Sequence, residues 1–147
     1  MICASENVGN ADPMALSVAV SASLAVERVG MPEAQIILSQ AASYVACAPK
    51  SNASCNAVFQ ALETVRQTGN LAIPAHLQDA HYKGAAKLGR GTGYKYAHDY
   101  PNNYVEQQYL PYELNGKEFY RPTGNGYEAR IREHMKRIKE EAAHGGK

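Results

Sequence analysis

Apolar residues follow the spacing of a helix in three consecutive segments of the first half of the chain. Over residues 13–28, Ala, Val, Leu and Ser leave almost no charged side chain before the last two positions, so we expect a helix that protein surrounds on nearly all sides. Asp12 followed by Pro13 favours a helix start, because aspartate accepts amide hydrogens and proline is tolerated in the first turn. We expect this helix to stop at Gly30.

Two further helices are predicted before residue 70. The second starts at Pro32 and ends at Pro49, and the third is capped by Ser51 or Asn52 and ends before Gly69. In the second helix we expect an apolar stripe that faces the first helix, formed by Ile37, Ala41, Tyr44, Val45 and Ala48. In the third helix we expect a buried apolar stripe formed by Val58, Ala61, Leu62 and Val65. Three helices with short links predict a helical bundle or array.

Prolines and glycines punctuate residues 71–126 and exclude long regular elements there. Within this segment we expect a short helix over 79–88, an irregular stretch over 89–103, a helical turn near 105–109 and an extended stretch over 117–121.

A last helix is predicted from Tyr127 to about Glu141. Its apolar side is formed by Tyr127, Ile131, Met135 and Ile138, and its solvated side by two ion pairs, Glu128 with Arg132 and Glu133 with Arg137. Residues 144–147 are expected to fray. The pattern therefore predicts an all-α fold, a helical bundle or array with a long irregular segment rich in Gly and Tyr and a C-terminal helix.

Composition narrows the class of protein. With 45% hydrophobic and 20% charged residues, the chain is neither disordered nor fibrous. The longest apolar stretch, 14–26, is interrupted by serines and is too short for a membrane span. Three cysteines without a CxxC pair argue against a disulfide framework or zinc ribbon and favour a reducing, cytoplasmic setting. The abrupt start, without a secretory signal, indicates a piece of a longer protein.

A glycine-rich segment over residues 89–95, Gly-Arg-Gly-Thr-Gly-Tyr-Lys, invites comparison with phosphate-binding loops. A nucleotide P-loop needs lysine and a hydroxyl residue directly after its last glycine, but Gly93 is followed by Tyr94. The dinucleotide pattern fails as well, because tyrosine occupies its third-glycine position. We interpret the segment as a turn-forming loop and expect no cofactor in this chain.

The same loop lies in a run without acidic residues between Asp79 and Asp99. Its four positive side chains are Lys83, Lys87, Arg90 and Lys95. These side chains form either a solvated face or contacts to a DNA backbone. Contacts to the backbone would not depend on the DNA sequence and would weaken with salt.

Eight of the ten tyrosines fall between Tyr94 and Tyr127. Such rings can stack on bases, but packing in an irregular segment or at a subunit interface explains the density more simply. The candidates for an oligomer interface are Tyr94, Tyr96, Tyr100, Tyr104, Tyr109 and Tyr112.

The indications of catalysis or metal binding are weak. A rival hypothesis, a free-standing enzyme, rests on the titratable cluster Lys95, His98 and Asp99. His76 and His81 are five residues apart, which is not a ligand spacing on one helix face, and no GxSxG motif occurs. We expect no catalytic residue and no metal site.

Five blocks of the sequence together resemble one family. They are SENVGNADP at 5–13, PKSNA at 49–53, HLQDAHY at 76–82, GYKYAHDYP at 93–101 and QQYLP at 107–111. They resemble the MgsA/RarA family, the replication-associated recombination AAA+ ATPases related to the Werner-helicase-interacting protein. The resemblance runs through nearly the whole chain, and the blocks from His76 to Pro111 are its most specific part.

The resemblance implies that this chain is the C-terminal part of a DNA-dependent ATPase. The AAA+ module of that ATPase would carry the P-loop, the Walker B acid, the arginine finger and the lid, and would bind ATP and magnesium. None of these motifs is in this sequence. Residues 1–70 would be a three-helix portion after the lid, similar to a clamp-loader collar. Residues 71–147 would pack on it to complete one oligomerisation domain.

The resemblance implies two kinds of partner. One is further copies of the same chain, in a homotetramer. The other is DNA at stalled or damaged replication forks, either as a fork or as a junction of single-stranded and double-stranded DNA. It implies a cytoplasmic, nucleoid-associated bacterial protein without a membrane partner. The alternative is an adaptor that docks another replication protein, such as single-strand binding protein, in an apolar groove. Asn7 and Gln78 depart from the family, which usually has Asp at the first position and often Arg at the second.

Overall fold

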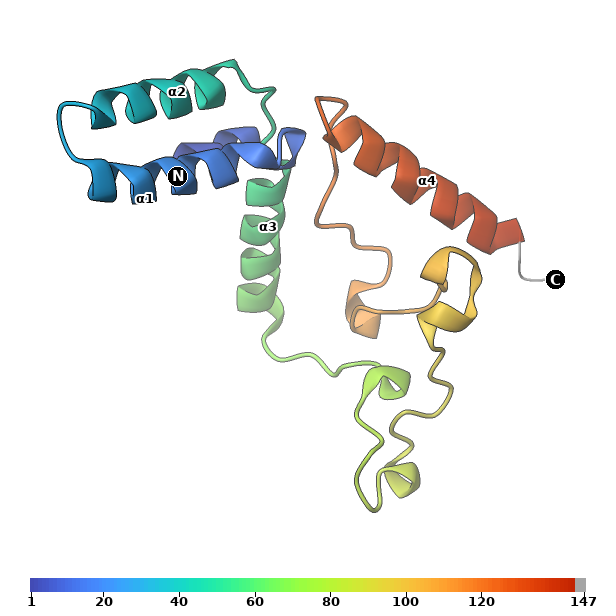
Figure 1. Cartoon of the computed structure of the whole chain (residues 1–147). Coiled ribbons are helices and arrows are strands. Elements are labelled where there is room, and N and C mark those ends of the chain that lie inside the picture. Colours follow the sequence, from blue (N-terminus) through green and yellow to red (C-terminus); the bar gives the residue numbers. More distant parts are fainter. Residues whose placement is uncertain (145–147) are drawn as a thin grey trace. The chain divides into compact units, whose positions relative to one another are not determined.

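The computed structural model describes residues 1–144 and contains helices but no strand among them (Figure 1). Its α-helices are α1 (Met14–Val29), α2 (Ala34–Cys47), α3 (Ala53–Thr68) and α4 (Glu128–His144). The short helical turns are η1 (Ala4–Val8), η2 (Gly9–Ala11), η3 (Ala75–Leu77), η4 (Ala86–Leu88), η5 (Ala97–Asp99), η6 (Pro101–Asn103) and η7 (Tyr112–Leu114). The predicted all-α class, with an irregular segment and a C-terminal helix, is confirmed. Residues 145–147, part of the expected frayed end, lie outside the described residues.

The ends of α1 are fixed by the residues that predicted them. The carboxylate of Asp12 accepts a hydrogen bond from the amide of Met14 at 3.0 Å, which satisfies one of the amides that a helix start leaves unpaired. At the other end, Gly30 takes φ +74° and its amide donates to the carbonyl of Val26 at 3.0 Å. A left-handed residue after the last turn is a common helix stop, and glycine adopts it without steric cost.

Helices α1 and α2 lie side by side (Figure 1). The best-buried apolar cluster is small: Ala4, Val8 and Ala15, with Ala19, Val45 and Ala48 packed against it. Because most of these residues are alanines, the backbones can approach closely, but little apolar area is available for burial. Large side chains of α1 such as Met14 and Leu24 are exposed, so the expectation that protein surrounds α1 on nearly all sides is wrong for the described chain.

Helix α3 presents its small residues inward and its large ones outward. Ala53 and Thr64 are buried, whereas Val58, Leu62 and Val65 are exposed. The prediction that the Val58, Leu62 and Val65 stripe is buried is therefore wrong. The stripe exists, but no element of the described chain covers it.

The irregular segment contains fewer helical turns than predicted. Residues 79–85 do not form a helix and only η4 follows them, since Gly84 and Gly89 take positive φ values that a helix does not contain. The turn predicted near 105–109 is absent, and helical turns occur instead at η5 and η6. η6 contains Asn102 in a left-handed conformation, so it cannot extend into a longer helix.

The chain divides into two compact units. One unit contains Met1–Glu63 with Phe119–His134, and the other contains Thr64–Glu118 with the chain from Met135 onward. Both α3 and α4 contribute residues to each unit. Residues 119–134, which the sequence placed with the second half of the chain, thus belong to the same unit as α1 and α2. None of the described helices is long and apolar enough to cross a membrane.

Substitution of Gly126 tests how tightly the first unit is packed. Gly126 has φ +51°, and a Cβ added there would overlap the carbonyl oxygen of Ala11 and lie 2.7 Å from Cγ of Pro49. We expect Gly126→Ala to lower the free energy of unfolding by about 2–4 kcal/mol, from left-handed strain and overpacking. Urea denaturation measures this change.

Gly69→Ala is the matched control. Gly69 also has a positive φ, +66°, but a Cβ there would meet open space. This variant should therefore lose only about 1–2 kcal/mol, the cost of the left-handed backbone. Equal losses in the two variants would contradict the close approach at Gly126.

Candidate functional site

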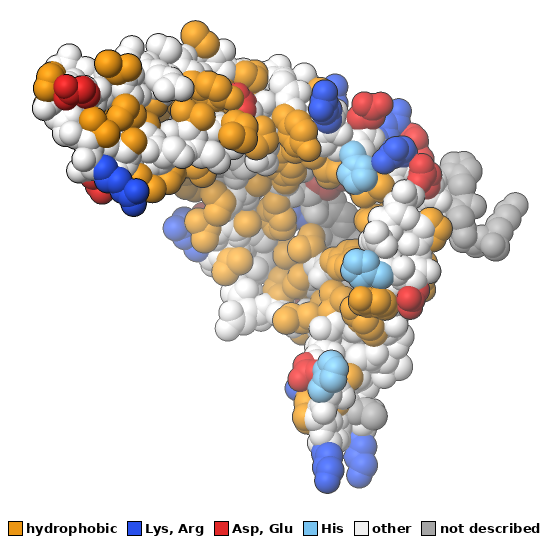
Figure 2. All heavy atoms as spheres, viewed as in Figure 1, with side chains coloured by type: hydrophobic (Ala, Val, Ile, Leu, Met, Phe, Trp, Pro, Cys, Tyr) orange, Lys and Arg blue, Asp and Glu red, His pale blue; other side chains and the backbone are white. Residues whose placement is uncertain are grey.

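The four predicted DNA contacts are exposed in the second unit. Lys87 lies in η4, with Lys83 before it and Arg90 after it, and Figure 2 shows Lys and Arg side chains at the end of this loop. The guanidinium of Arg90 lies 5.5 Å from the centre of the Tyr82 ring, a cation–π contact that orients it. Three positive charges therefore project from one short loop.

The loop is closed by backbone contacts rather than by a regular element. The amide of Gly91 donates to the carbonyl of Ala75 at 2.7 Å, and a Cβ on Gly91 would lie 2.5 Å from Cβ of Ala80. Only glycine permits this approach at φ +70°. The glycine-rich segment is thus a loop closure, as the turn interpretation required.

Asp79 is the acidic residue nearest to this loop in the sequence. Hydrogen bonds from the backbone amide of His81 at 2.9 Å and from its ring at 2.7 Å lower the pKa of Asp79 below its ordinary value. The charge of Arg90 contributes in the same direction. Asp79 thus stays ionised beside the loop and offsets part of its positive charge.

Lys95 lies in a different environment from the other three positive residues. It lines a cavity of about 440 Å³ together with Tyr100, Tyr104, Glu106 and Glu141. The two carboxylates reduce the positive potential around Lys95. Among the four predicted DNA contacts, Lys83, Lys87 and Arg90 are therefore the stronger candidates for contact with a phosphate backbone.

The predicted interface tyrosines are mostly accessible. Exposed rings are those of Tyr94, Tyr96, Tyr100, Tyr109 and Tyr112, and Tyr104 is half-buried. Two of these residues are held locally, because the hydroxyl of Tyr109 donates to the carbonyl of Val105 at 3.0 Å and the Tyr96 ring lies 5.0 Å from that of His98. The rings are therefore displayed on the second unit rather than used to build its interior.

The rival catalytic cluster is not assembled. His98 packs its ring against Tyr96, Asp99 ends η5, and Lys95 lines the cavity described above. His76 binds the carbonyl of Gln108 through Nε2 at 2.9 Å, which is a structural contact. Within residues 1–144, no three His, Cys, Asp or Glu side chains are grouped as metal ligands.

A buried carboxylate at the start of α4 was missed by the sequence analysis. Glu128 is 0% exposed, and both of its oxygens accept hydrogen bonds. Oε2 accepts from the Ser51 hydroxyl at 2.7 Å, from the Thr123 amide at 2.7 Å and from the Thr123 hydroxyl at 2.8 Å. Oε1 accepts from the Tyr120 hydroxyl at 2.9 Å. The predicted pair of Glu128 with Arg132 on the solvated side is therefore wrong.

The contacts of Glu128 join three segments that are far apart in the sequence. Tyr120 in turn accepts a hydrogen bond from Asn10 at 3.2 Å, and the Ser51 hydroxyl also accepts from the amide of Ala53 at 3.2 Å, which caps α3. The same carboxylate thus connects the η2 segment, the link between α2 and α3, and the start of α4. An acidic residue in the first turn of a helix is a weak sign of such a role.

Hydrogen bonding keeps Glu128 ionised. Burial by itself raises the pKa of this carboxyl, but the hydrogen bonds from Ser51, Thr123 and Tyr120 outweigh it, and the pKa is lower than the ordinary value. The pKa of Tyr120 is raised, chiefly by burial, with the neighbouring carboxylate of Glu128 acting in the same direction. Glu128 is therefore a structural anion and has no proton to donate at neutral pH.

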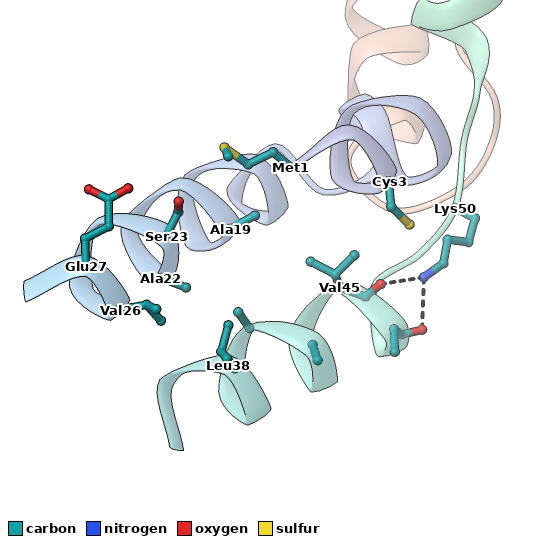
Figure 3. A pocket seen from close by; sticks show the side chains of 13 residues that line it. Met1, Cys3, Ala19, Ala22, Ser23, Val26, Glu27, Leu38, Val45 and Lys50 are labelled. Carbon is teal, nitrogen blue, oxygen red and sulfur yellow. Dashed lines mark hydrogen bonds between the residues drawn. The ribbon is translucent and has the colours of Figure 1, made fainter. Parts of the chain in front are cut away.

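An apolar cavity lies in the first unit, between α1, α2 and the first residues of the chain (Figure 3). Its volume is about 650 Å³, and its walls are mainly alanine, valine and leucine side chains, with Met1 and Cys3 at one side. The ammonium of Lys50 donates to the carbonyls of Val45 at 2.8 Å and Ala46 at 3.0 Å, and also to that of Ala48. Lys50 therefore neutralises the C-terminal end of α2 and leaves the cavity apolar.

Comparison with known proteins gives a consistent answer. Residues 1–139 match the family described as MgsA AAA+ ATPase C terminal. The chain is 48% identical to an AAA domain-containing protein of Mycobacterium tuberculosis, over 95% of this chain and 31% of that protein. It is 45% identical to the replication-associated recombination protein A of Bacillus subtilis, over 86% of this chain and 30% of that protein.

The corresponding protein of Escherichia coli K12, also called replication-associated recombination protein A, is 42% identical over 90% of this chain and 30% of its own length. The chain thus spans about 30% of the length of the curated relatives it matches. These relatives are bacterial, and their names describe replication-associated recombination and an AAA domain.

Removing the charge of Glu128 tests its structural role. In Glu128→Gln the amide group of glutamine would face the fixed amide of Thr123, leaving at least one buried donor unpaired. We expect the free energy of unfolding at pH 7 to fall by about 2–4 kcal/mol. Glu133→Gln, an exposed position on the same helix, should change it little.

The pH dependence gives an independent check. Because the folded-state pKa of Glu128 is depressed, its contribution is complete above the unfolded-state pKa of about 4.3 and is lost as the pH falls through the folded-state value. The difference between wild type and Glu128→Gln should therefore narrow in acid, as measured by urea denaturation between pH 7 and pH 3. A difference that stays constant over this range would show that charge is not the cause.

Proposed function

The chain belongs to the family of MgsA AAA+ ATPase C-terminal domains, and from this membership we propose that it is an oligomerisation and DNA-engagement domain. It would arrange the ATPase modules of a replication-associated recombination protein into a homotetramer and hold DNA at stalled forks. The parent would be a DNA-dependent ATPase of the bacterial cytoplasm, with ATP and magnesium bound outside the sequence described here.

The DNA half of the proposal rests on the η4 loop. Lys83, Lys87 and Arg90 are exposed within eight residues, and the run from 80 to 98 contains no acidic side chain. Side chains of this kind contact phosphates without reading bases, and such contacts suit a protein that binds forks of any sequence. Lys95, beside Glu106 and Glu141, would contribute less.

The oligomerisation half rests on the exposed rings of residues 94–112, which we call the tyrosine segment. Five large aromatic side chains remain accessible there, although the unit has few aliphatic residues with which to build an interior. Tyrosine is favoured at interfaces because its ring buries apolar area while its hydroxyl finds a hydrogen-bond partner. A further copy of the chain would supply that surface.

A second candidate function is a structural adaptor. The cavity between α1 and α2 is apolar and open at the surface of the first unit (Figure 3), and it would accept an apolar segment of another replication protein such as single-strand binding protein. Binding of that protein by the chain without DNA, abolished by filling the cavity through Ala41→Phe, would favour the adaptor.

Substitution in the η4 loop tests DNA engagement. With forked DNA, Lys83→Ala combined with Lys87→Ala should weaken binding for all sequences alike. The slope of log K against log salt concentration should become shallower by about 1.8, because roughly 0.9 of a counterion is released per duplex phosphate contact. Fluorescence anisotropy at several salt concentrations measures both quantities.

Lys136→Ala is the matched control for this experiment, because Lys136 is also exposed but lies on α4, 3.7 Å from the carboxylate of Glu140. Its affinity and salt slope should equal those of the wild type. Binding that is absent, or that does not respond to salt, would contradict the DNA role.

Assembly is tested by light scattering over a wide range of concentrations. Wild type should have the mass of a tetramer, and Tyr94→Glu combined with Tyr112→Glu should lower that mass, because two charges would be placed in the tyrosine segment. Tyr127→Glu, a similarly exposed ring outside the segment, should leave the mass unchanged. A strictly monomeric wild type would refute the oligomerisation role.

A further inference from the structure

Asparagine is followed directly by glycine at two places in the sequence, Asn115-Gly116 and Asn125-Gly126. This pair of residues is prone to spontaneous deamidation, because a glycine without a Cβ lets its amide nitrogen reach the side-chain carbonyl carbon of the preceding residue. Asparagine is accordingly counted among the thermolabile residues. Since both sites contain the same reactive pair, their surroundings decide which of them reacts.

Asn115 and Gly116 form the centre of an exposed turn in the second unit. Asn115 takes φ −55° and ψ 133°, Gly116 takes φ +75°, and the amide of Lys117 donates to the carbonyl of Leu114 at 3.0 Å. These values define a type II turn, whose third position favours glycine. Within residues 1–144, the side chain of Asn115 and the amide of Gly116 have no hydrogen-bond partner. A Cβ on Gly116 would meet open space, so both reacting groups can move.

Asn125 is held in place in the first unit, although it is also exposed. Its side-chain Nδ2 donates to the carbonyl of Lys50 at 2.9 Å, and its own carbonyl accepts from the amide of Glu128 at 3.1 Å. Two residues further along the chain, the amide of Tyr127 donates to the carbonyl of Ala11 at 2.7 Å. Ring closure at Asn125 has to release its side chain and rotate a peptide that is fixed on both sides.

We propose that Asn115 is a site of spontaneous deamidation in the folded chain, and that Asn125 is protected from the same reaction. The amide nitrogen of Gly116 attacks the side-chain carbonyl carbon of Asn115 and closes a five-membered succinimide ring. The side-chain nitrogen of Asn115 leaves as ammonia, which takes up the proton that the Gly116 amide loses. Water then adds to either ring carbonyl and opens the ring. This chemistry is independent of the assembly and DNA roles proposed above.

The reaction changes the chain in two ways. The new carboxylate brings the formal net charge of +1 to zero. When the ring opens to isoaspartate, the main chain in addition runs through the former side-chain methylene, so an extra carbon separates Leu114 from Lys117 and the geometry of the turn is lost. The ammonium of Lys117 donates to the Thr64 hydroxyl at 2.7 Å. Isoaspartate therefore disturbs this contact, whereas aspartate preserves the main chain that supports it.

The first test follows both sites in the whole 147-residue chain by peptide mapping and mass spectrometry during incubation at mildly alkaline pH. In the folded chain we expect Asn115 to convert about tenfold faster than Asn125 or more, because Asn125 reacts only through local opening. In guanidinium chloride the two sites should convert at similar rates. Asn115→Gln, whose side chain would have to close a larger ring, should stay unmodified at that position. Equal rates in the folded chain, or a slower rate at Asn115, would refute the proposal.

The second test identifies the product and its effect on the turn. Ion exchange should separate the deamidated chain, and an aspartate-specific protease should reveal both aspartate and isoaspartate at position 115. Aspartate alone would indicate direct hydrolysis and overturn the cyclic route.

Asn115→Asp is the matched control for charge, because it carries the new carboxylate without the extra main-chain carbon. The isoaspartate form should unfold at a lower denaturant concentration than Asn115→Asp. Equal midpoints would contradict the loss of the turn.

Discussion

The first unit depends on a single buried anion. Glu128 can remain charged without contact to water because four hydrogen bonds, from Ser51, Tyr120 and twice from Thr123, replace its hydration. Removing one partner from such a network leaves a buried polar group unsatisfied, which costs more than the bond contributes when formed. The carboxylate therefore fixes the start of α4 against the link between α2 and α3. The glycine at 126 then allows the backbone to approach Ala11 and Pro49.

A unit of this kind needs a polar centre because its apolar core is modest. Its best-buried cluster is built largely from alanines, and the large aliphatic side chains of α1, α2 and α3 lie mostly at the surface (Figure 2). Directional hydrogen bonds specify the arrangement of segments that a small core would hold only loosely. Large side chains such as those of Val58 and Leu62 on α3 are therefore exposed in the described chain.

The sequence predicted the helices well where local chemistry decides the outcome. Asp12 with Pro13, Gly30, Pro49 and Gly69 mark helix ends through their own backbone preferences, and helices α1, α2 and α3 follow these signals closely. The family was likewise recognisable, because its blocks extend through most of the chain. The positive residues and tyrosines were correctly expected in an irregular segment, and their roles in binding DNA and further copies stay predictions.

Contacts between residues far apart in the sequence could not be predicted from local patterns. Glu128 and Arg132 have the spacing of a solvated ion pair, and nothing local reveals that Ser51, 77 residues away, binds the carboxylate instead. The stripe of α3 was recognised, but periodicity does not tell whether another element of the chain covers it. Short helices over 79–88 and 105–109 failed because left-handed residues and tight turns override weak helical propensity.

Lys50 differs from the other lysines in its chemistry. Its ammonium donates its hydrogens to three carbonyls at the end of α2, whereas Lys83 and Lys87 extend into solvent. An amine reacts with acylating reagents through the lone pair of its nitrogen, and in Lys50 three backbone carbonyls hold the hydrogens of that nitrogen. Surface labelling with such reagents would therefore leave Lys50 largely unmodified in the folded chain, and its acylation would report that the end of α2 has opened.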